Sequence, residues 1–543
     1  MMNFKCIASL AAALATMTLY SCSAEDVSNV SVLPEVPVNQ RTEVTDLRTL
    51  NAEAPIPPQC YTKTDSKFNP CYTCHQTYPK GEGLETRMNV MNDGGLQGSY
   101  DFSDIGVNNH WSNLFVDRND WLKAVSDDSI LEYINQDNYS SLAGRLKEQD
   151  WQGFIPDLEN YAKAATAFDE KGLARDGSHW VAFNYKPFLG TFWPTNGSTD
   201  DVVIRLPEAF RSLNGQFDVD AYYINLTIAE LSLKNLDSAI LWEVDENRFG
   251  VDLDNNGSLN KTNKISKRTT YVGDAKNINV VDKQFPTGTE FMHSVRYVGV
   301  EQNDKIVIPP RMKELRYMKK VNTLTAGQLD NKYWNERKEK FLGELPGFLR
   351  KGDEGFDNSL GWYVKGFIED YNGDLRPQTY EEDFFCMGCH ANIGTTIDST
   401  FSFARKVTGG EGWGYINLHG MKDAPSVGEP ESNEILAYLK RAGGGSEFRE
   451  NPEMIQKWFN QDGTVNEEKV KAADVYTLLA PSRERALNLN KAYSHIVRHQ
   501  SFIHGRDATW SPVENVIHEV TAKDEPLSEE NRFLGWDMRL NWN

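Results

Sequence analysis

Two cysteine pairs of identical pattern constrain this chain more than any other feature of its sequence. Each pair has the form C-x-x-C and is followed at once by histidine, as CYTCH at residues 71–75 and CMGCH at residues 386–390. The chain has only ten histidines among its 543 residues, so both placements are not expected by chance. We therefore expect the two sites to hold the same kind of group.

Three other kinds of site use paired cysteines, and each fits poorly. A zinc site shared by the two pairs needs a gap of about 15–20 residues, far shorter than the gap here. A thioredoxin-like redox pair needs no following histidine. Two plain disulfides would leave both histidines without a role. Covalent haem attachment uses the whole C-x-x-C-H pattern.

Haem attachment explains each residue type in the pattern. Two thiols add across the vinyl groups on one edge of the porphyrin, and the adjacent histidine binds the iron as proximal ligand. The pattern predicts proximal ligands at His75 and His390. Cys60 lies outside both pairs and is expected to form no disulfide within the chain. The expected thioether residues of the two c-type haems are Cys71, Cys74, Cys386 and Cys389.

The N-terminus indicates export. Residues 7–20 form an almost continuous apolar run, too short to span a bilayer. The residues before Cys22 resemble a bacterial lipoprotein signal, in which Cys22 is lipidated and becomes the new N-terminus. Tyr20 departs from the small residue usual there, so cleavage after Ala24 is the alternative. The expected location is the cell envelope, as a periplasmic or outer-membrane lipoprotein tethered to a membrane by its lipid.

On the two pentapeptides and the export signal, the chain resembles the bacterial c-type cytochromes. The resemblance implies covalent haem, iron ligation and an envelope location, but no particular fold. Dihaem peroxidases carry the same motifs with a much shorter gap between them, which argues against a peroxidase.

The charge balance limits the partners. The chain has 57 basic and 78 acidic residues, a net charge of −21. Nucleic acid and anionic lipid are therefore excluded as main partners, because both would be repelled. The balance favours a basic redox partner protein, and an acidic surface that only maintains solubility is the alternative.

Composition shifts and local patterns predict a multidomain protein. We expect a mainly α fold with irregular loops and a minor β component, in which two c-type haem regions flank a haem-free middle region. The expected divisions are a signal peptide at 1–22, a flexible tether at 23–48, a first haem region at 49–119, a middle region at 120–350 and a helical second haem domain at 351–543.

Apolar runs and capping residues predict several elements. Residues 202–206 and 305–308 read as strands, each ended by proline. Residues 127–135 read as a helix with an acidic start. In the C-terminal part, Ser432 and Ser482 are expected to begin amphipathic helices, the second of which runs toward His499.

The second axial position of each iron separates electron carriers from catalysts, because only an open iron binds a small substrate. For the first haem, His110 is the expected distal ligand and His293 the alternative. For the second haem, the candidates are His419, Met421 and His499.

A short acidic loop resembles the opening of an EF-hand calcium site. Oxygen ligands at alternate positions can converge on one cation, and glycine lets the chain turn around it. Asn263 replaces the bidentate glutamate of the twelfth position, and a metal-free acidic turn is the alternative. The candidate calcium ligands are Asp252, Asp254, Asn256 and Ser258.

The expected function is one-electron transfer through two covalent haems. The alternative is a dihaem oxidoreductase, peroxidase- or oxygenase-like, with one open catalytic haem. The large middle region favours the alternative, whereas the supply of histidines favours two closed sites. No catalytic residue is identified.

Overall fold

A computed structural model describes residues 33–43, 45, 49–63, 105–342, 348–391, 396–443, 450–521 and 537–543. The signal peptide, Cys22 and the first haem motif at 71–75 lie outside the described residues. The second motif at 386–390 lies inside them. Within the described residues no helix combines the length and apolarity needed to cross a membrane.

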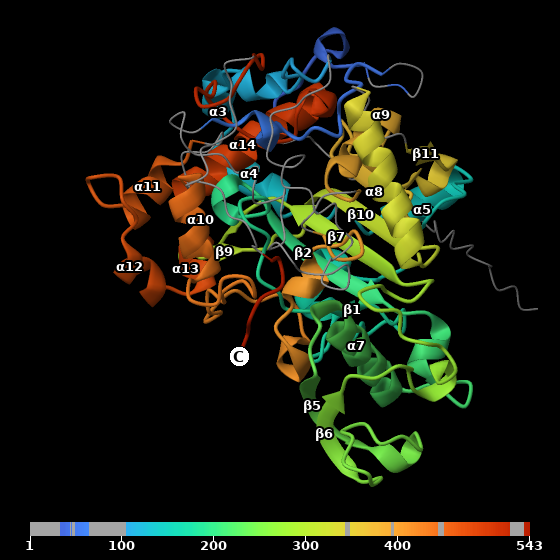
Figure 1. The fold of residues 1–543 in the computed structure, drawn as a ribbon. Coiled ribbons are helices and arrows are strands. Elements are labelled where there is room, and N and C mark those ends of the chain that lie inside the picture. Colours follow the sequence, from blue (N-terminus) through green and yellow to red (C-terminus); the bar gives the residue numbers. More distant parts are fainter. Residues whose placement is uncertain are drawn as a thin grey trace, which may run out of the picture.

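An eight-stranded antiparallel sheet forms the centre of the molecule (Figure 1). It contains strands from both sides of residue 350. In spatial order the strands are β1 (Val181–Ala182), β2 (Thr199–Arg205), β7 (Glu290–Arg296), β10 (Met312–Lys320), β13 (Trp362–Glu369), β12 (Phe356–Asp357) and β11 (Leu349–Arg350), with β14 (Leu375–Pro377) also paired to β13.

The prediction of a mainly α fold is therefore wrong. The reason for the wrong prediction is visible in β10. This strand buries charged residues near its start, where a sequence pattern would normally require apolar residues. Lys313 and Glu314 are both almost fully buried there, and Glu314 is paired with arginine. A strand of this kind reads as polar in the sequence, although ion pairs allow its burial.

The two faces of the sheet carry separate cores, as the two-residue period of a strand requires. Val203, Met292 and Leu315 face a cluster formed mostly by residues 139–182. Ile204 and Phe291 face the opposite way, toward the largest core cluster. That second face also carries the candidate site.

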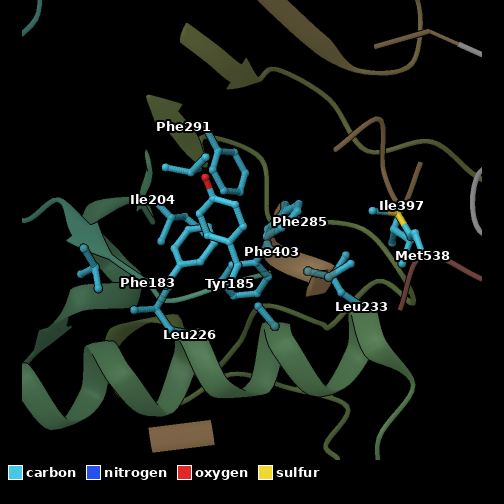
Figure 2. Packing of buried hydrophobic residues seen from close by; sticks show 14 of the residues in the cluster. Phe183, Tyr185, Ile204, Leu226, Leu233, Phe285, Phe291, Ile397, Phe403 and Met538 are labelled. Atoms are coloured by element: carbon cyan, nitrogen blue, oxygen red, sulfur yellow. The ribbon is translucent and has the colours of Figure 1, made fainter. Parts of the chain in front are cut away.

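Helix α7 (Val219–Lys234) packs beneath this second face. Its buried residues run around the whole helix, because the chain surrounds it on all sides. Figure 2 shows Leu226 and Leu233 on α7, below the ring of Tyr185. In Figure 1 the hairpin of β5 (Ser238–Asp245) and β6 (Lys261–Ser266) projects beyond α7.

Apart from the long helices α8 and α14, the remaining helices and strands are short. The strands are β3 (Ser212–Leu213), β4 (Gln216–Phe217), β8 (Gly299–Val300) and β9 (Ile306–Val307). The helices are α3 (Asn119–Ala124), α4 (Asp127–Ile134), α5 (Leu142–Glu148), α6 (Ala164–Ala167), α8 (Ala326–Phe341), α9 (Tyr380–Phe384), α10 (Glu434–Ala442), α11 (Pro452–Trp458), α12 (Glu467–Ala472), α13 (Val475–Leu479) and α14 (Arg483–His499).

Most of the local predictions are confirmed. The strands predicted at 202–206 and 305–308 are β2 and β9, and the predicted helix 127–135 is α4. The Ser482 side chain accepts a hydrogen bond from Arg485 N at 3.2 Å and caps α14 as expected. Helix α10 begins one residue later than predicted, with Asn433 at its N-cap.

The N-terminal segment joins the body earlier than predicted. Leu33 and Val36, inside the segment expected to be a tether, are buried. Arg498 on α14 donates to the Leu33 carbonyl at 3.1 Å. The chain therefore already contacts the body at Leu33 and Val36.

Candidate functional site

A cavity of about 390 Å³ lies on the second face of the sheet. This volume falls within the range of roughly 300–1,000 Å³ typical of ligand and cofactor sites. Three neighbouring strands supply one wall through alternate residues. The strand residues that line it include Asp200 and Val202 of β2, Phe291, His293 and Val295 of β7, and Glu314, Arg316 and Met318 of β10.

The second cysteine pair supplies another wall of the same cavity. A capping box of Thr379 and Glu382 starts α9, which continues into the 3-10 turn Phe385–Gly388. The backbone N–H groups of Cys389 and His390 both donate to the Cys386 carbonyl, at 3.1 and 3.0 Å. This compact turn places both thiols and the imidazole among the residues that line the cavity.

His390 is held as an iron ligand requires. Its Nδ1 lies 2.9 Å from the Ser399 carbonyl, which can only accept, so Nδ1 carries the proton and Nε2 keeps its lone pair. Burial lowers the pKa of His390 to about 4, so the ring is neutral at pH 7. The Phe401 ring packs edge-on against it at 5.5 Å.

His293 enters the same cavity from the centre of the sheet. Its Nε2 lies 3.2 Å from Asp200 Oδ2, and the Tyr185 hydroxyl donates to the same oxygen at 2.5 Å. The contact with Asp200 engages Nε2, so Nδ1 is the ring nitrogen that this contact leaves available. The Phe192 ring lies 5.0 Å away and limits rotation of the imidazole.

The two thiols fit covalent haem better than a bare metal ion. Burial raises the pKa of both Cys386 and Cys389 to about 11, so both are neutral thiols. Within the described ranges, these sulfurs and His390 do not converge on one point as the ligands of a zinc ion do. A haem has separate attachment points for two thiols and an imidazole, and the aromatic lining suits a porphyrin.

A second segment closes over the cysteine turn. A Cβ atom at position 388 would lie 2.0 Å from the Pro55 carbonyl oxygen, so only glycine fits between the pair. Pro55, Ile56 and Cys60 also line the cavity. Cys386 and Cys389 form no disulfide with a described residue.

A buried charge cluster that no sequence pattern indicates flanks the thiols. Glu314 lies 2.9 Å from Arg316 Nε and 3.1 Å from Arg506 Nη1. Burial alone would raise the pKa of Glu314, but the two guanidinium groups lower it to about 2. The cluster therefore remains ionised and fixes this end of the cavity wall.

The other candidate ligands lie elsewhere. His419 stacks on Tyr476 with ring centroids 3.7 Å apart, and Met421 is buried in the main core. His499 stacks on a neighbouring histidine of α14, and His110 contacts the Ile105 carbonyl at 3.4 Å. None of these four lines the cavity. The structure therefore places His293, expected near the first haem, beside the second motif.

The acidic loop forms a compact turn with one acid that sequence reasoning missed. Asp252 accepts from Gly257 N at 2.7 Å, and backbone hydrogen bonds of this kind lower its pKa. Carboxylate oxygens of Asp252, Asp254 and the buried Glu246 lie within 4.8 Å of one another. Asn256 accepts from Ser258 N at 2.9 Å. Glu246 precedes the loop in sequence, so the EF-hand pattern could not reveal it.

Comparisons with known proteins identify a lipoprotein family. Residues 44–477 match the model of a family described as "-like lipoprotein", and the chain belongs to this family. An uncharacterized lipoprotein of Aquifex aeolicus (strain VF5) is 33% identical over 533 residues, covering 86% of this chain and 87% of the relative. No solved structure matches. Membership of a lipoprotein family indicates an exported protein of the cell envelope.

Proposed function

We propose that this lipoprotein is a periplasmic or outer-membrane cytochrome that binds c-type haem in the sheet-lined cavity. One observation carries the proposal: the CMGCH turn opens on an aromatic cavity with both thiols and the His390 imidazole along its wall. Cys386 and Cys389 would form the thioethers, and His390 Nε2 would bind the iron. Haem bound in this way supplies reversible one-electron chemistry.

His293 supports electron transfer rather than catalysis at an open iron. A histidine that binds a metal commonly donates its other ring N–H to a carboxylate, which orients the ring and increases its basicity. Asp200 holds His293 in this manner. We propose that His293 is the second axial ligand of this haem, which would leave no position for a small substrate. Because this chain has a large negative net charge, the partner that we propose is a basic redox protein.

Loss of the second cysteine pair tests haem attachment. The Cys386→Ala/Cys389→Ala chain is expected to carry one covalent haem where the natural chain carries two, because the first motif at 71–75 is intact. The measurement is a pyridine haemochrome assay after acid-acetone extraction, with the intact mass of each chain. Cys60→Ala is the matched control and should keep both haems. A natural chain without covalent haem would overturn the proposal.

We also propose that the loop at 252–258 binds calcium together with Glu246. Calcium at about 100 times its dissociation constant is expected to stabilise the fold by about 2.7 kcal/mol. Asp252→Asn should remove most of this gain, because it deletes a charged ligand. Thermal unfolding with calcium or with chelator measures the effect, and Asp462→Asn in another exposed turn is the control. Identical unfolding midpoints with and without calcium would show that the acidic turn does not bind calcium.

A further inference from the structure

The end of α8 carries an exposed apolar face. Trp334 is 65% exposed, Phe341 87% and Leu342 55%, and Phe341 is the most exposed large apolar side chain of the described residues. Phe341 and Leu342 follow Trp334 by seven and eight positions, so all three share one side of the helix. We call these three residues, with the exposed Lys338 between them, the α8 patch.

The expected lipid anchor holds this body close to the surface of a bilayer. Ten residues, and so eleven steps along the chain, separate Cys22, the expected lipidation site, from Leu33, where the chain is fixed to α14. A fully extended chain covers at most about 3.6 Å per residue, so this segment spans no more than about 40 Å. A folded chain of this length has a radius of gyration of about 24 Å and hence a larger diameter than the segment can span. Some face of the body therefore has to lie near the lipid surface.

The chemistry of the α8 patch fits the boundary of a bilayer. Tryptophan is favoured at the level of the lipid headgroups, and phenylalanine and leucine are common apolar residues of segments that bind there. Lys338 can extend its charged end toward the headgroups from such a position. Since the whole chain has a net charge of −21, a zwitterionic surface suits it better than an anionic one.

We propose that the α8 patch inserts into the zwitterionic lipid surface to which the N-terminal lipid anchors the protein. The contact sets the orientation of the body on the membrane. This inference rests on the α8 geometry and on the lipoprotein family, and it is independent of the haem proposal.

Vesicle binding without the lipid anchor tests the inference. The mature chain from residue 23, exported behind a cleavable signal, is mixed with phosphatidylcholine vesicles and sedimented. We expect measurable binding, and roughly a tenfold or larger fall in the partition coefficient for Trp334→Ser/Phe341→Ser, because two large apolar side chains no longer leave water. Ile240→Ser, at a 57% exposed position on β5, is the control and should bind as the unmodified chain does.

Three outcomes would overturn the inference. The first is no binding of the unmodified chain, and the second is equal binding of the double variant. The third is a dimer, seen by sedimentation velocity, that the double variant loses, because a second copy would then cover the patch. Unchanged thermal unfolding of both variants excludes a folding defect.

Discussion

His293→Ala is expected to keep both covalent haems and to convert one of them from low-spin to high-spin. Attachment depends on the thiols of Cys386 and Cys389, so the variant should retain its haem. Loss of an axial imidazole opens one iron position, which changes the spin state. Absorption and EPR spectra of the oxidised and reduced protein measure the change, and added imidazole should restore the low-spin spectrum.

The control and a second variant separate ligation from a structural role. His419→Ala removes a histidine that stacks on Tyr476 outside the cavity and should leave the spectra unchanged. Asp200→Asn should keep the haem low-spin and raise its reduction potential, because the carboxylate no longer increases the basicity of His293. If the natural chain binds haem that is already high-spin at this site, His293 is not a ligand, and the alternative of an open catalytic haem gains support.

Glu434→Ala is expected to destabilise the fold by about 3–5 kcal/mol, because it leaves the buried Arg405 guanidinium without its carboxylate partner. Arg405 makes two contacts with the Glu434 carboxylate, at 2.8 and 2.6 Å, and Lys186 makes a third at 2.7 Å. All three side chains are completely buried. Denaturant unfolding monitored by circular dichroism measures the loss.

An exposed ion pair provides the control for this variant. Glu467 pairs with lysines in solvent, where such pairs contribute little. Glu467→Ala should therefore leave the unfolding midpoint nearly unchanged. A Glu434→Ala midpoint equal to that of the natural chain would show that the buried network does not stabilise the fold.

The Glu434 network also predicts a pH dependence. Burial alone would raise the pKa of Glu434, but Arg405 and Lys186 outweigh burial and hold the pKa below its ordinary value of 4.5. The stabilisation is therefore fully present above that ordinary value and is lost as the pH falls toward the lowered pKa. The difference in unfolding free energy between Glu434→Ala and the natural chain should shrink over that acidic range.

Local features of this chain were predictable, whereas the arrangement of its site was not. The caps of α4 and α14 and the CMGCH turn depend on residues close in sequence, which a pattern can reveal. The cavity depends on register between distant strands, where His293 lies beside Val202 on one side and Arg316 on the other. Since β10 buries charges within ion pairs, its sequence does not read as a strand. The sequence therefore suggests His293 only as the alternative ligand of the other haem, after His110.

The contact between Gly388 and the Pro55 carbonyl restricts the order of maturation. The segment at 55–60 comes from the start of the chain, yet it packs over a turn that leaves the translocation channel more than three hundred residues later. Once this segment is in place, Cys386 is buried and out of reach of a large attachment enzyme. If this pair holds haem as proposed, the haem would have to be joined before the segment at 55–60 packs over the turn. Haem offered to the folded apoprotein would then attach poorly, whereas haem present during folding would attach.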